Sequence, residues 1–243
     1  MSAYFQELDY QITSLGGLSL RRRRDLASGE DIYEIKLNED FLMSSQFTTS
    51  EKALATLGLG ELSGGGFDVV VGGLGLGYTA AAALEKQEVQ SLVVVDALRP
   101  VIEWHEQGML PLGSTIASDS RCRLVHGDFF AMAREPETGF DPHEPGRRFD
   151  AILLDIDHSP RHVLDPENAT LYTPQGLKTL SDHLTSGGVF ALWSNEPEDL
   201  GFTAELQGVF EQARAERVVF YNPLQEREVQ QAVYLARKGK GDA

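Results

Sequence analysis

Three glycines at alternate positions, Gly73, Gly75 and Gly77, follow an apolar run and precede an alanine-rich segment that predicts a helix. Glycine permits a sharp turn and a close approach of backbone to ligand, and the free amides at a helix N-terminus favour a polar or anionic group. Gly73, Leu74, Gly75 and Gly77 are therefore candidate ligands of a nucleoside cofactor. On these residues alone, a dinucleotide site or a simple tight turn between a strand and a helix fits equally.

Acidic residues at the ends of the next two predicted strands indicate adenosine. Asp96 stands roughly 20 residues beyond the glycines, where a carboxylate accepts hydrogen bonds from both ribose hydroxyls, and Ala97 follows it. Asp128 ends the third strand, where an acid suits the adenine amino group, and Phe129 offers an aromatic neighbour for the adenine ring. Dinucleotide enzymes do not usually carry this third-strand acid, so the choice falls on S-adenosylmethionine or its decarboxylated form. The alternative is that Asp128 is only the N-cap of a helix that begins at Phe129.

Two carboxylates and an imidazole converge where the fourth predicted strand ends, at the edge on which open α/β sheets place their reactive groups. Asp155 and Asp157 are candidate catalytic residues, because crowded and partly desolvated carboxylates can have raised pKa values and accept a proton from an attacking amine. Asp155 is also a candidate cofactor ligand. Asp157, His158 and Glu196 are candidate substrate ligands. The alternative is structural: both aspartates stabilise a turn, and Glu196 faces solvent.

A parallel sheet is needed to bring these candidates together. Five apolar, β-branched runs alternate with helix-length segments from Phe67 onward, which indicates strands buried on both faces and joined by helices. The last two runs are separated by roughly half a dozen polar residues, too few for a crossover helix, and predict an antiparallel hairpin. The expected fold is α/β, a Rossmann-like methyltransferase fold with a mostly parallel seven-stranded sheet and an antiparallel C-terminal hairpin. Its helices are expected to begin near Tyr78, Pro100, Phe129 and Thr173.

The N-terminal part of the chain has a different pattern. Short alternating stretches from Leu18 to Met43 predict small β-hairpins, and helical spacing follows from Ser50 to Leu57. Gly64-Gly65-Gly66 then forms a break. We therefore divide the chain into an N-terminal β-hairpin appendage with a linking helix, residues 1–63, and a nucleoside-binding domain, residues 64–243. The polar stretch between residues 135 and 148 predicts a surface loop.

Composition limits the partners. The 243 residues carry a net charge of -16, a field that repels nucleic acid and favours cationic small molecules. The run from Arg21 to Arg24 reads as a solvated hairpin face, with phosphate contact as the alternative. Neither a membrane-spanning run nor a signal peptide is seen, so we expect a cytoplasmic protein without membrane contact. The single cysteine, Cys122, is expected in a buried strand, and six histidines without ligand spacing give no metal site.

The main domain resembles the spermidine synthase, or polyamine aminopropyltransferase, family from about Phe67 to Trp193. VVVGGLGLG is similar to the family's glycine motif, VVVDAL to its ribose-binding strand, HGDFF to its adenine-side acid and FDAILLDIDHSP to its catalytic segment. The resemblance implies that Asp155 deprotonates the attacking amine and that Asp96 and Asp128 hold the nucleoside. It also suggests a homodimer contact through the N-terminal hairpins, although hairpin edges occur in monomers as well.

Three departures from the family pattern bear on the substrate. The family's glycine loop usually contains an aspartate that grips the amine of the cofactor, and Gly75 stands in its place. His158 replaces the second aspartate of the catalytic segment. Thr48-Thr49-Ser50-Glu51 stands roughly where the family has a tyrosine-histidine-glutamate signature. These changes weaken the case for polyamine substrates in particular.

Three functions therefore compete. The first is transfer of an aminopropyl group from decarboxylated S-adenosylmethionine to a small-molecule amine, with Asp155 as base and catalysis largely by positioning. The second is methylation of a small molecule by S-adenosylmethionine. The third is a non-catalytic nucleoside-binding protein of the same fold. The presence of Asp96, Asp128 and Asp155 argues against this third function.

Overall fold

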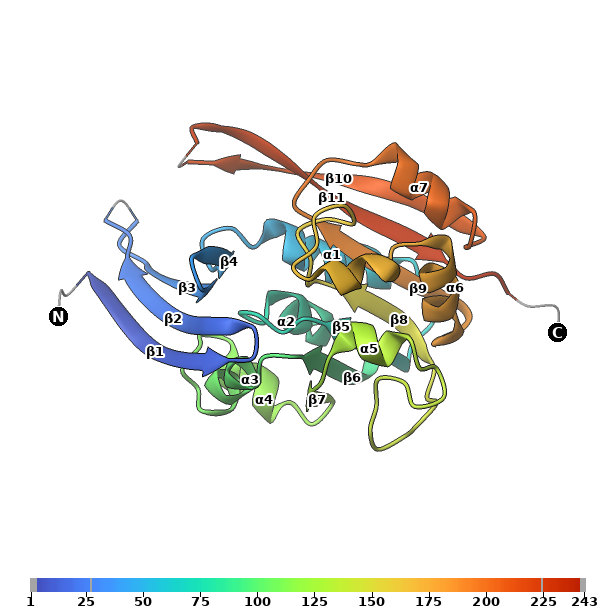
Figure 1. Ribbon diagram of the computed structural model, residues 1–243, viewed down its shortest axis with the longest axis horizontal. Coiled ribbons are helices and arrows are strands. Elements are labelled where there is room, and N and C mark those ends of the chain that lie inside the picture. Colours follow the sequence, from blue (N-terminus) through green and yellow to red (C-terminus); the bar gives the residue numbers. More distant parts are fainter. Residues whose placement is uncertain (1–3, 27, 224, 241–243) are drawn as a thin grey trace.

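The computed structural model describes residues 4–26, 28–223 and 225–240, which form two β-sheets and their helices (Figure 1). The smaller sheet is antiparallel, in the order β1-β2-β3-β4. The sequence analysis predicted hairpins from Leu18 to Met43 but not the first strand. Its strands are β1 (Phe5–Thr13), β2 (Gly16–Arg24), β3 (Asp31–Leu37) and β4 (Asp40–Ser44).

The larger sheet has the order β10-β11-β9-β8-β5-β6-β7. Five neighbouring strands run parallel, β11 is antiparallel to β9, and β10 closes the predicted C-terminal hairpin. The predicted fold class is thereby confirmed. The chain passes outward on one side of β5 and returns on the other, so the strand order reverses there, and ligands of such sheets bind beyond the carboxyl ends at this point. The strands are β5 (Phe67–Gly72), β6 (Val89–Asp96), β7 (Cys122–His126), β8 (Phe149–Leu154), β9 (Leu184–Ser194), β10 (Gln212–Asn222) and β11 (Arg227–Arg237).

Helices cover both faces of the larger sheet (Figure 1). Their side chains form two buried clusters, one under α1 to α4 and the smaller sheet, the other under α5 to α7. All four predicted helix starts agree with the structure to within one residue, whereas α4 and α7 were not predicted. The helices are α1 (Thr49–Gly60), α2 (Tyr78–Leu84), α3 (Arg99–Glu106), α4 (Gly113–Ser118), α5 (Phe129–Ala133), α6 (Pro174–Asp182) and α7 (Leu200–Gln207), with the 3₁₀ helix η1 (Pro166–Thr170).

The smaller sheet is joined to the larger domain by a shared core and a polar contact. Leu18 and Leu20 are fully buried in the same cluster as the helices α1 to α4. Trp104 Nε1, in α3, donates a 2.7 Å hydrogen bond to Asp9 Oδ2 in β1. The run from Arg21 to Arg24 lies in β2, and all four guanidinium groups pair with carboxylates of the same sheet. These pairs fit the solvated face expected from the sequence.

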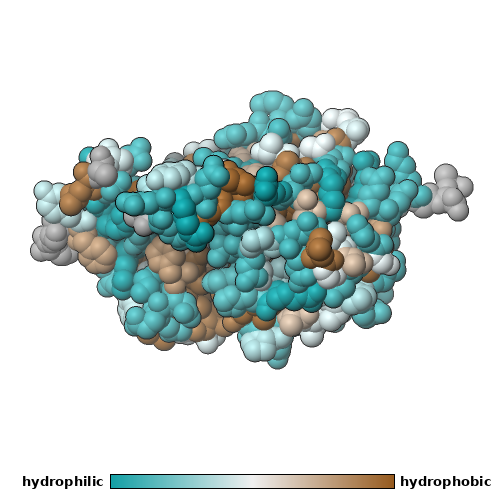
Figure 2. Space-filling view, turned by 90° about the horizontal axis from the view of Figure 1, so that it is seen from above, coloured by the Kyte–Doolittle hydropathy of each residue, from teal (hydrophilic) through white to brown (hydrophobic). Residues whose placement is uncertain are grey.

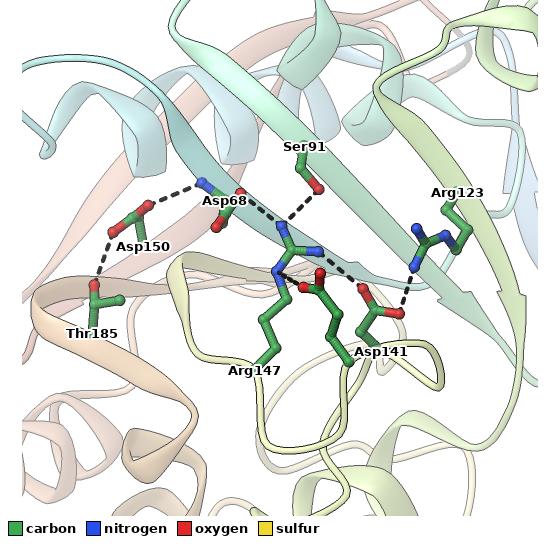
Figure 3. A network of polar contacts seen from close by, with 8 residues as sticks. Asp68, Ser91, Arg123, Asp141, Arg147, Asp150 and Thr185 are labelled. Atoms are coloured by element: carbon green, nitrogen blue, oxygen red, sulfur yellow. Dashed lines mark hydrogen bonds and ion pairs between the residues drawn. The ribbon is translucent and has the colours of Figure 1, made fainter.

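The loop between residues 135 and 148 is held by a polar network at the amino ends of the parallel strands (Figure 3). Asp141 is fully buried and pairs with Arg123 and Arg147 at 2.5 and 2.9 Å. Arg147 also bonds Asp68 at 2.7 Å, at the start of β5, and Ser91 at 2.9 Å in β6. The predicted loop is therefore anchored at the edge opposite the glycine turn, so it belongs to the support of the sheet.

The surface carries polar side chains over most of the face that is in view (Figure 2). The face seen in Figure 2 is mainly hydrophilic, with apolar residues in separate groups. Cys122 is half-buried at the start of β7, and burial first, then the charge of Asp119, raises the pKa of its thiol to about 12. Across the described ranges, we find no helix with the length and apolar character that a membrane crossing requires.

Candidate functional site

The glycine loop lies at the carboxyl end of β5, the central strand. Gly73 has φ +93° and Gly75 has φ +48°, backbone conformations that favour glycine. A Cβ on Gly73 would collide with the carbonyl oxygen of Asp155 on the neighbouring strand. The sequence analysis explained this glycine by the close approach of a ligand. The contact with the Asp155 carbonyl shows that packing within the protein also requires glycine here. Gly77 caps α2, and Leu74 is almost fully buried.

Asp96 holds the glycine loop from the side of β6. Its Oδ2 accepts a 2.9 Å hydrogen bond from the amide of Leu74, and its Oδ1 accepts one of 2.8 Å from the amide of Leu98. Burial raises the pKa of this carboxyl, and the amide bonds partly offset the rise. Asp96 is therefore the acid expected near a ribose, and it also holds the glycine loop in place through the amide of Leu74. The sequence analysis did not predict this structural role. Ala97 follows it at the exposed rim.

Asp128 lies one strand further along the same edge. Gly127 donates from its amide to the carbonyl of Asp96 at 3.0 Å, so the ends of β6 and β7 are in contact. Asp128 Oδ1 accepts from the amides of Phe130 at 2.9 Å and Ala131 at 3.2 Å, which makes Asp128 the N-cap of α5. Its Oδ2 has no hydrogen-bond partner among the described residues, and the side chain is exposed. The cap therefore leaves one carboxylate oxygen able to accept from an adenine amino group.

Phe129 does not lie where the sequence analysis expected it. Its side chain is 1% exposed and stacks on Phe140, with ring centroids 4.6 Å apart, inside the second core cluster. A Cβ added to Gly72 would lie 2.6 Å from its ring, so the ring fills the space beside β5. The expectation that this ring faces adenine is corrected. The residue turns into the core because it occupies the first position of α5, whose inward face it forms.

Asp155 faces a second carboxylate that the sequence analysis did not select. Asp155 Oδ2 accepts a 2.6 Å hydrogen bond from Thr79 Oγ1 in the first turn of α2, and the same hydroxyl lies 3.2 Å from the carbonyl of Glu51 in α1. Glu51 is 7% exposed, and burial followed by the charge of Asp155 raises its pKa to about 7. Burial raises the pKa of Asp155 to about 6, against the opposing effect of the bond from Thr79.

Two carboxylates in proximity resist double ionisation, so we expect the buried Glu51 and the half-buried Asp155 to keep one proton between them near neutral pH. The available sequence signal was the tyrosine-histidine-glutamate position, where Glu51 retains the carboxylate while the two preceding residues differ.

Asp157 belongs to a different environment from Asp155. Its side chain is fully buried, and three donors occupy it: the amide of Leu164 at 2.7 Å, Asn168 Nδ2 at 3.0 Å and Tyr172 Oη at 2.7 Å. This geometry favours the structural alternative for Asp157, since three donors from the loop that follows β8 bind its carboxylate. Burial raises the pKa of this carboxyl, as the sequence analysis expected, and the three hydrogen bonds oppose the rise.

The other two candidate substrate ligands lie in the loops after β8 and β9. The carbonyl of His158 accepts a 2.7 Å hydrogen bond from the amide of Asn195, so the two loops are in contact. The ring of His158 is half-buried and lies 4.9 Å from that of His162. Glu196 is exposed, and its amide donates to Ser194 Oγ at 3.2 Å. Glu196 therefore lies at the rim, away from the buried carboxylate pair.

Met43 and His105 contact the glycine loop from outside it, and neither was a sequence candidate. Met43 Sδ, in β4, accepts a 3.0 Å hydrogen bond from the amide of Leu76 and lies 2.7 Å from the position of a Cβ on Gly75. His105 Nε2 lies 3.0 Å from the carbonyl of Gly75, and burial lowers the pKa of this imidazole. The place of the family's loop aspartate is thus taken by an uncharged thioether.

Comparisons with known proteins identify the fold. A search against models of protein families finds none that matches this chain. Among solved structures, a spermidine synthase in complex with the transition-state analogue AdoDATO superposes with a TM-score of 0.73 at 18% identity, covering 97% of this chain and 74% of that one. Spermidine synthase from Thermotoga maritima gives a TM-score of 0.72, with the same identity and coverage. The resemblance predicted from the sequence therefore holds at the level of the fold, N-terminal strands included.

Proposed function

We propose that this protein is a transferase that acts on an adenosyl sulfonium donor and passes an aminopropyl group from decarboxylated S-adenosylmethionine to a small-molecule amine. The observation that carries the proposal is the pair formed by the half-buried Asp155 and the buried Glu51 beside the glycine loop. This pair supplies a base of raised pKa at the point where the strand order reverses. The spermidine synthases with the same fold supply the precedent for the reaction class.

The strand ends suit a nucleoside. Asp96 lies against the glycine loop at the place of a ribose ligand, and its two carboxylate oxygens retain lone pairs beside the amide bonds that they accept. Asp128 Oδ2 remains available for the adenine amino group. Because the ring of Phe129 lies in the core, it does not contribute to adenine binding. The carboxylates of Asp96 and Asp128 therefore provide the specificity for adenosine in this proposal.

Asp155 is the base in this proposal. An alkyl amine has a pKa of about 10 and is protonated in water, so it must lose a proton before its lone pair attacks carbon. A carboxylate held in a buried site accepts that proton at a cost that falls as its own pKa rises. Glu51 is a positioning residue that keeps the pKa of the pair high, while Thr79 fixes the orientation of Asp155. Asp157 orders the loop that carries His158.

The thioether of Met43 supports methyl transfer as a second candidate. The tail of decarboxylated S-adenosylmethionine ends in a lone ammonium group, whereas the methionine tail of S-adenosylmethionine is a zwitterion. A loop without a carboxylate at Gly75 lacks the anionic partner that the lone cation needs. If S-adenosylmethionine is the donor, the same Asp155 deprotonates the acceptor for methylation.

Calorimetric titration with S-adenosylmethionine, its decarboxylated form and methylthioadenosine tests the proposal, followed by turnover with primary amines. We expect all three nucleosides to bind, the decarboxylated form more tightly than S-adenosylmethionine, and methylthioadenosine to be released on turnover. Transfer from S-adenosylmethionine alone would establish the methyltransferase. Binding without turnover would leave a nucleoside-binding protein, and absence of binding would contradict the proposal.

The variant Asp155→Asn separates the base from the nucleoside site. It is expected to lower turnover by at least about 100-fold while methylthioadenosine binding stays within a factor of three, because the residue acts on the amine. Thermal unfolding of the variant is the control for folding. Wild-type turnover in Asp155→Asn would remove this carboxylate from the reaction.

A further inference from the structure

Trp193, near the end of β9, has a buried donor without a partner. Its indole Nε1 is shielded from solvent and makes no hydrogen bond to any described residue. A buried and unpaired N–H costs about 1 to 3 kcal/mol, so it needs an explanation when it lies beside a candidate site. The other tryptophan of the chain differs in this respect, since Trp104 Nε1 is bonded to Asp9.

Gln231, in β11, has a buried acceptor without a partner. Its Oε1 is also shielded and unpaired within the described residues, while its Nε2 donates a 2.5 Å hydrogen bond to Asn195 Oδ1 and so fixes the amide. The protein thus holds one unsatisfied donor and one unsatisfied acceptor on adjacent strands. A hydroxyl group has the chemistry that both atoms lack, because it can accept one hydrogen bond and donate another.

Strand register places both atoms on the side of the sheet that carries Asp155. In the parallel pair β8 and β9, Leu154 lies opposite Leu192, so Asp155 falls beside Trp193. In the antiparallel pair β9 and β11, Trp193 lies opposite Val233, and Gln231 is two residues further along on the same face.

The packing of the hydrophobic core also places Trp193 and Gln231 on this side of the sheet. Trp193 packs against the cluster under α1 to α4, and Val218, opposite Gln231 in β10, belongs to that cluster. Asp155 reaches Thr79 in α2 on this same side of the sheet.

We propose that Trp193 Nε1 and Gln231 Oε1 form a subsite for the unreactive end of the acceptor, and that this end is a neutral hydroxyl. The acceptor class is then an amino alcohol, with its amine at Asp155 and its hydroxyl between the indole and the amide. The inference rests on the proposed transferase function and specifies its substrate.

The surrounding charges favour a neutral group over a second ammonium. A diamine needs an anionic partner at each end, since an unpaired buried ammonium is strongly unfavourable. His158 stands where the family has its second aspartate, Asp157 is occupied by three donors, and Glu196 is exposed at the rim. Glu51 and Asp155 form the pair that the proposed function assigns to the reacting amine. A hydroxyl needs only the two unpaired atoms.

The test compares acceptors that differ only at the distal end: linear amino alcohols of three to five carbons, the diamines of equal length, and the plain alkyl amines. The readouts are kcat/KM for transfer and calorimetric binding to protein loaded with methylthioadenosine. We expect kcat/KM and affinity to be about tenfold or more higher for the best amino alcohol than for the diamine and the alkyl amine of equal length. This factor corresponds to one or two buried hydrogen bonds.

Trp193→Phe keeps the ring and removes the N–H. It should reduce kcat/KM and binding of the amino alcohol by about tenfold and leave the alkyl amine within a factor of two. Gln231→Met removes the acceptor and gives an independent version of the test if the first variant fails to fold. Trp104→Phe is the matched control, expected to leave the ratio between acceptors unchanged although it removes an indole hydrogen bond elsewhere.

Equal effects of the variants on all three acceptor classes, or a preference of the protein for the diamine, would overturn the inference. So would equal affinity for acceptors with different distal groups, the result expected if a water molecule alone pairs with Trp193 Nε1 and Gln231 Oε1. In each of these cases transfer from the sulfonium donor still occurs and the proposed function stands. Failure of methylthioadenosine to bind is the separate outcome that contradicts the function itself.

Discussion

Thr79 Oγ1 donates a 2.6 Å hydrogen bond to Asp155 Oδ2 and thereby joins the first turn of α2 to the end of β8. The glycine loop leads directly into this turn, so the backbone expected to approach the nucleoside also positions the hydroxyl that orients the proposed base. The bond stabilises the charged form of Asp155, whereas burial raises the pKa of the same carboxyl. The state of Asp155 near neutral pH results from these two opposing effects.

Thr79→Val removes the hydrogen bond and keeps the shape of the side chain. Loss of a bond to the ionised form raises the pKa of Asp155, so the acidic limb of kcat/KM against pH should move upward by roughly one unit. Thr79→Ser retains the hydroxyl and should preserve the wild-type limb. An unmoved limb in the valine variant would show that Asp155 is not the group whose ionisation limits the rate.

Glu51 makes folding stability depend on pH. Its ordinary pKa is 4.5, and the folded value is about 7. Between these values the folded protein keeps a proton that the unfolded chain has lost, so the free energy of unfolding falls as pH rises through this window and remains lower above it. Glu51→Gln should therefore raise Tm at pH 8 by about 2 °C or more relative to wild type and leave it nearly unchanged at pH 5.

Thermal unfolding of Glu51→Gln and wild type at the two pH values measures this difference. Glu39→Gln is a suitable control because Glu39 is exposed. An equal shift at both pH values would mean that the substitution acts through packing rather than through the proton.

The fold and the edge of the sheet that carries the strand-end acids were predictable because they depend on local patterns. Apolar β-branched runs dictate buried parallel strands, and an acid at the end of each such strand must lie on the same edge. The pairing of Asp96 with the glycine loop follows from the adjacency of β5 and β6. The first strand was missed because β1 alternates weakly: its residues are exposed or only half-buried.

The remaining errors arose from contacts between distant segments. Glu51 is remote in sequence from Asp155, and the packing of α1 against α2 and against β8 brings the two together. Asp157 stands two residues beyond Asp155, a spacing that a strand would keep on one face, but β8 ends at Leu154. In the loop that follows, Asn168 and Tyr172 surround Asp157. Phe129 was misassigned for a related reason, since the direction of a side chain in the first turn of a helix depends on the core beneath it.

Asp157→Ala should destabilise the protein without removing the nucleoside site. The substitution leaves the amide of Leu164, Asn168 Nδ2 and Tyr172 Oη without their buried acceptor, at a cost of about 3 kcal/mol or more. Denaturant unfolding measures the loss, and calorimetry with methylthioadenosine at low temperature measures binding. Asp165→Ala, at the exposed N-cap of η1, should cost only about 1 kcal/mol. A stable Asp157→Ala protein that lacks turnover would restore a direct role for Asp157 in the reaction.

Restoring the missing loop aspartate tests how Met43 affects donor choice. Gly75→Asp alone should lower Tm, because its Cβ would lie 2.7 Å from Met43 Sδ and its φ of +48° is unfavourable for most side chains, although aspartate tolerates it better than most. Met43→Ala removes the collision, so the double variant should recover stability. Relative to Met43→Ala, the double variant should bind decarboxylated S-adenosylmethionine about tenfold more tightly, as expected for a new charge-assisted hydrogen bond to the ammonium group. The affinity for S-adenosylmethionine should rise less, because the new carboxylate at position 75 repels the carboxylate of the methionine tail. Calorimetry with both donors measures the ratio; an equal gain for the two would show that residue 75 does not face the end of the donor tail.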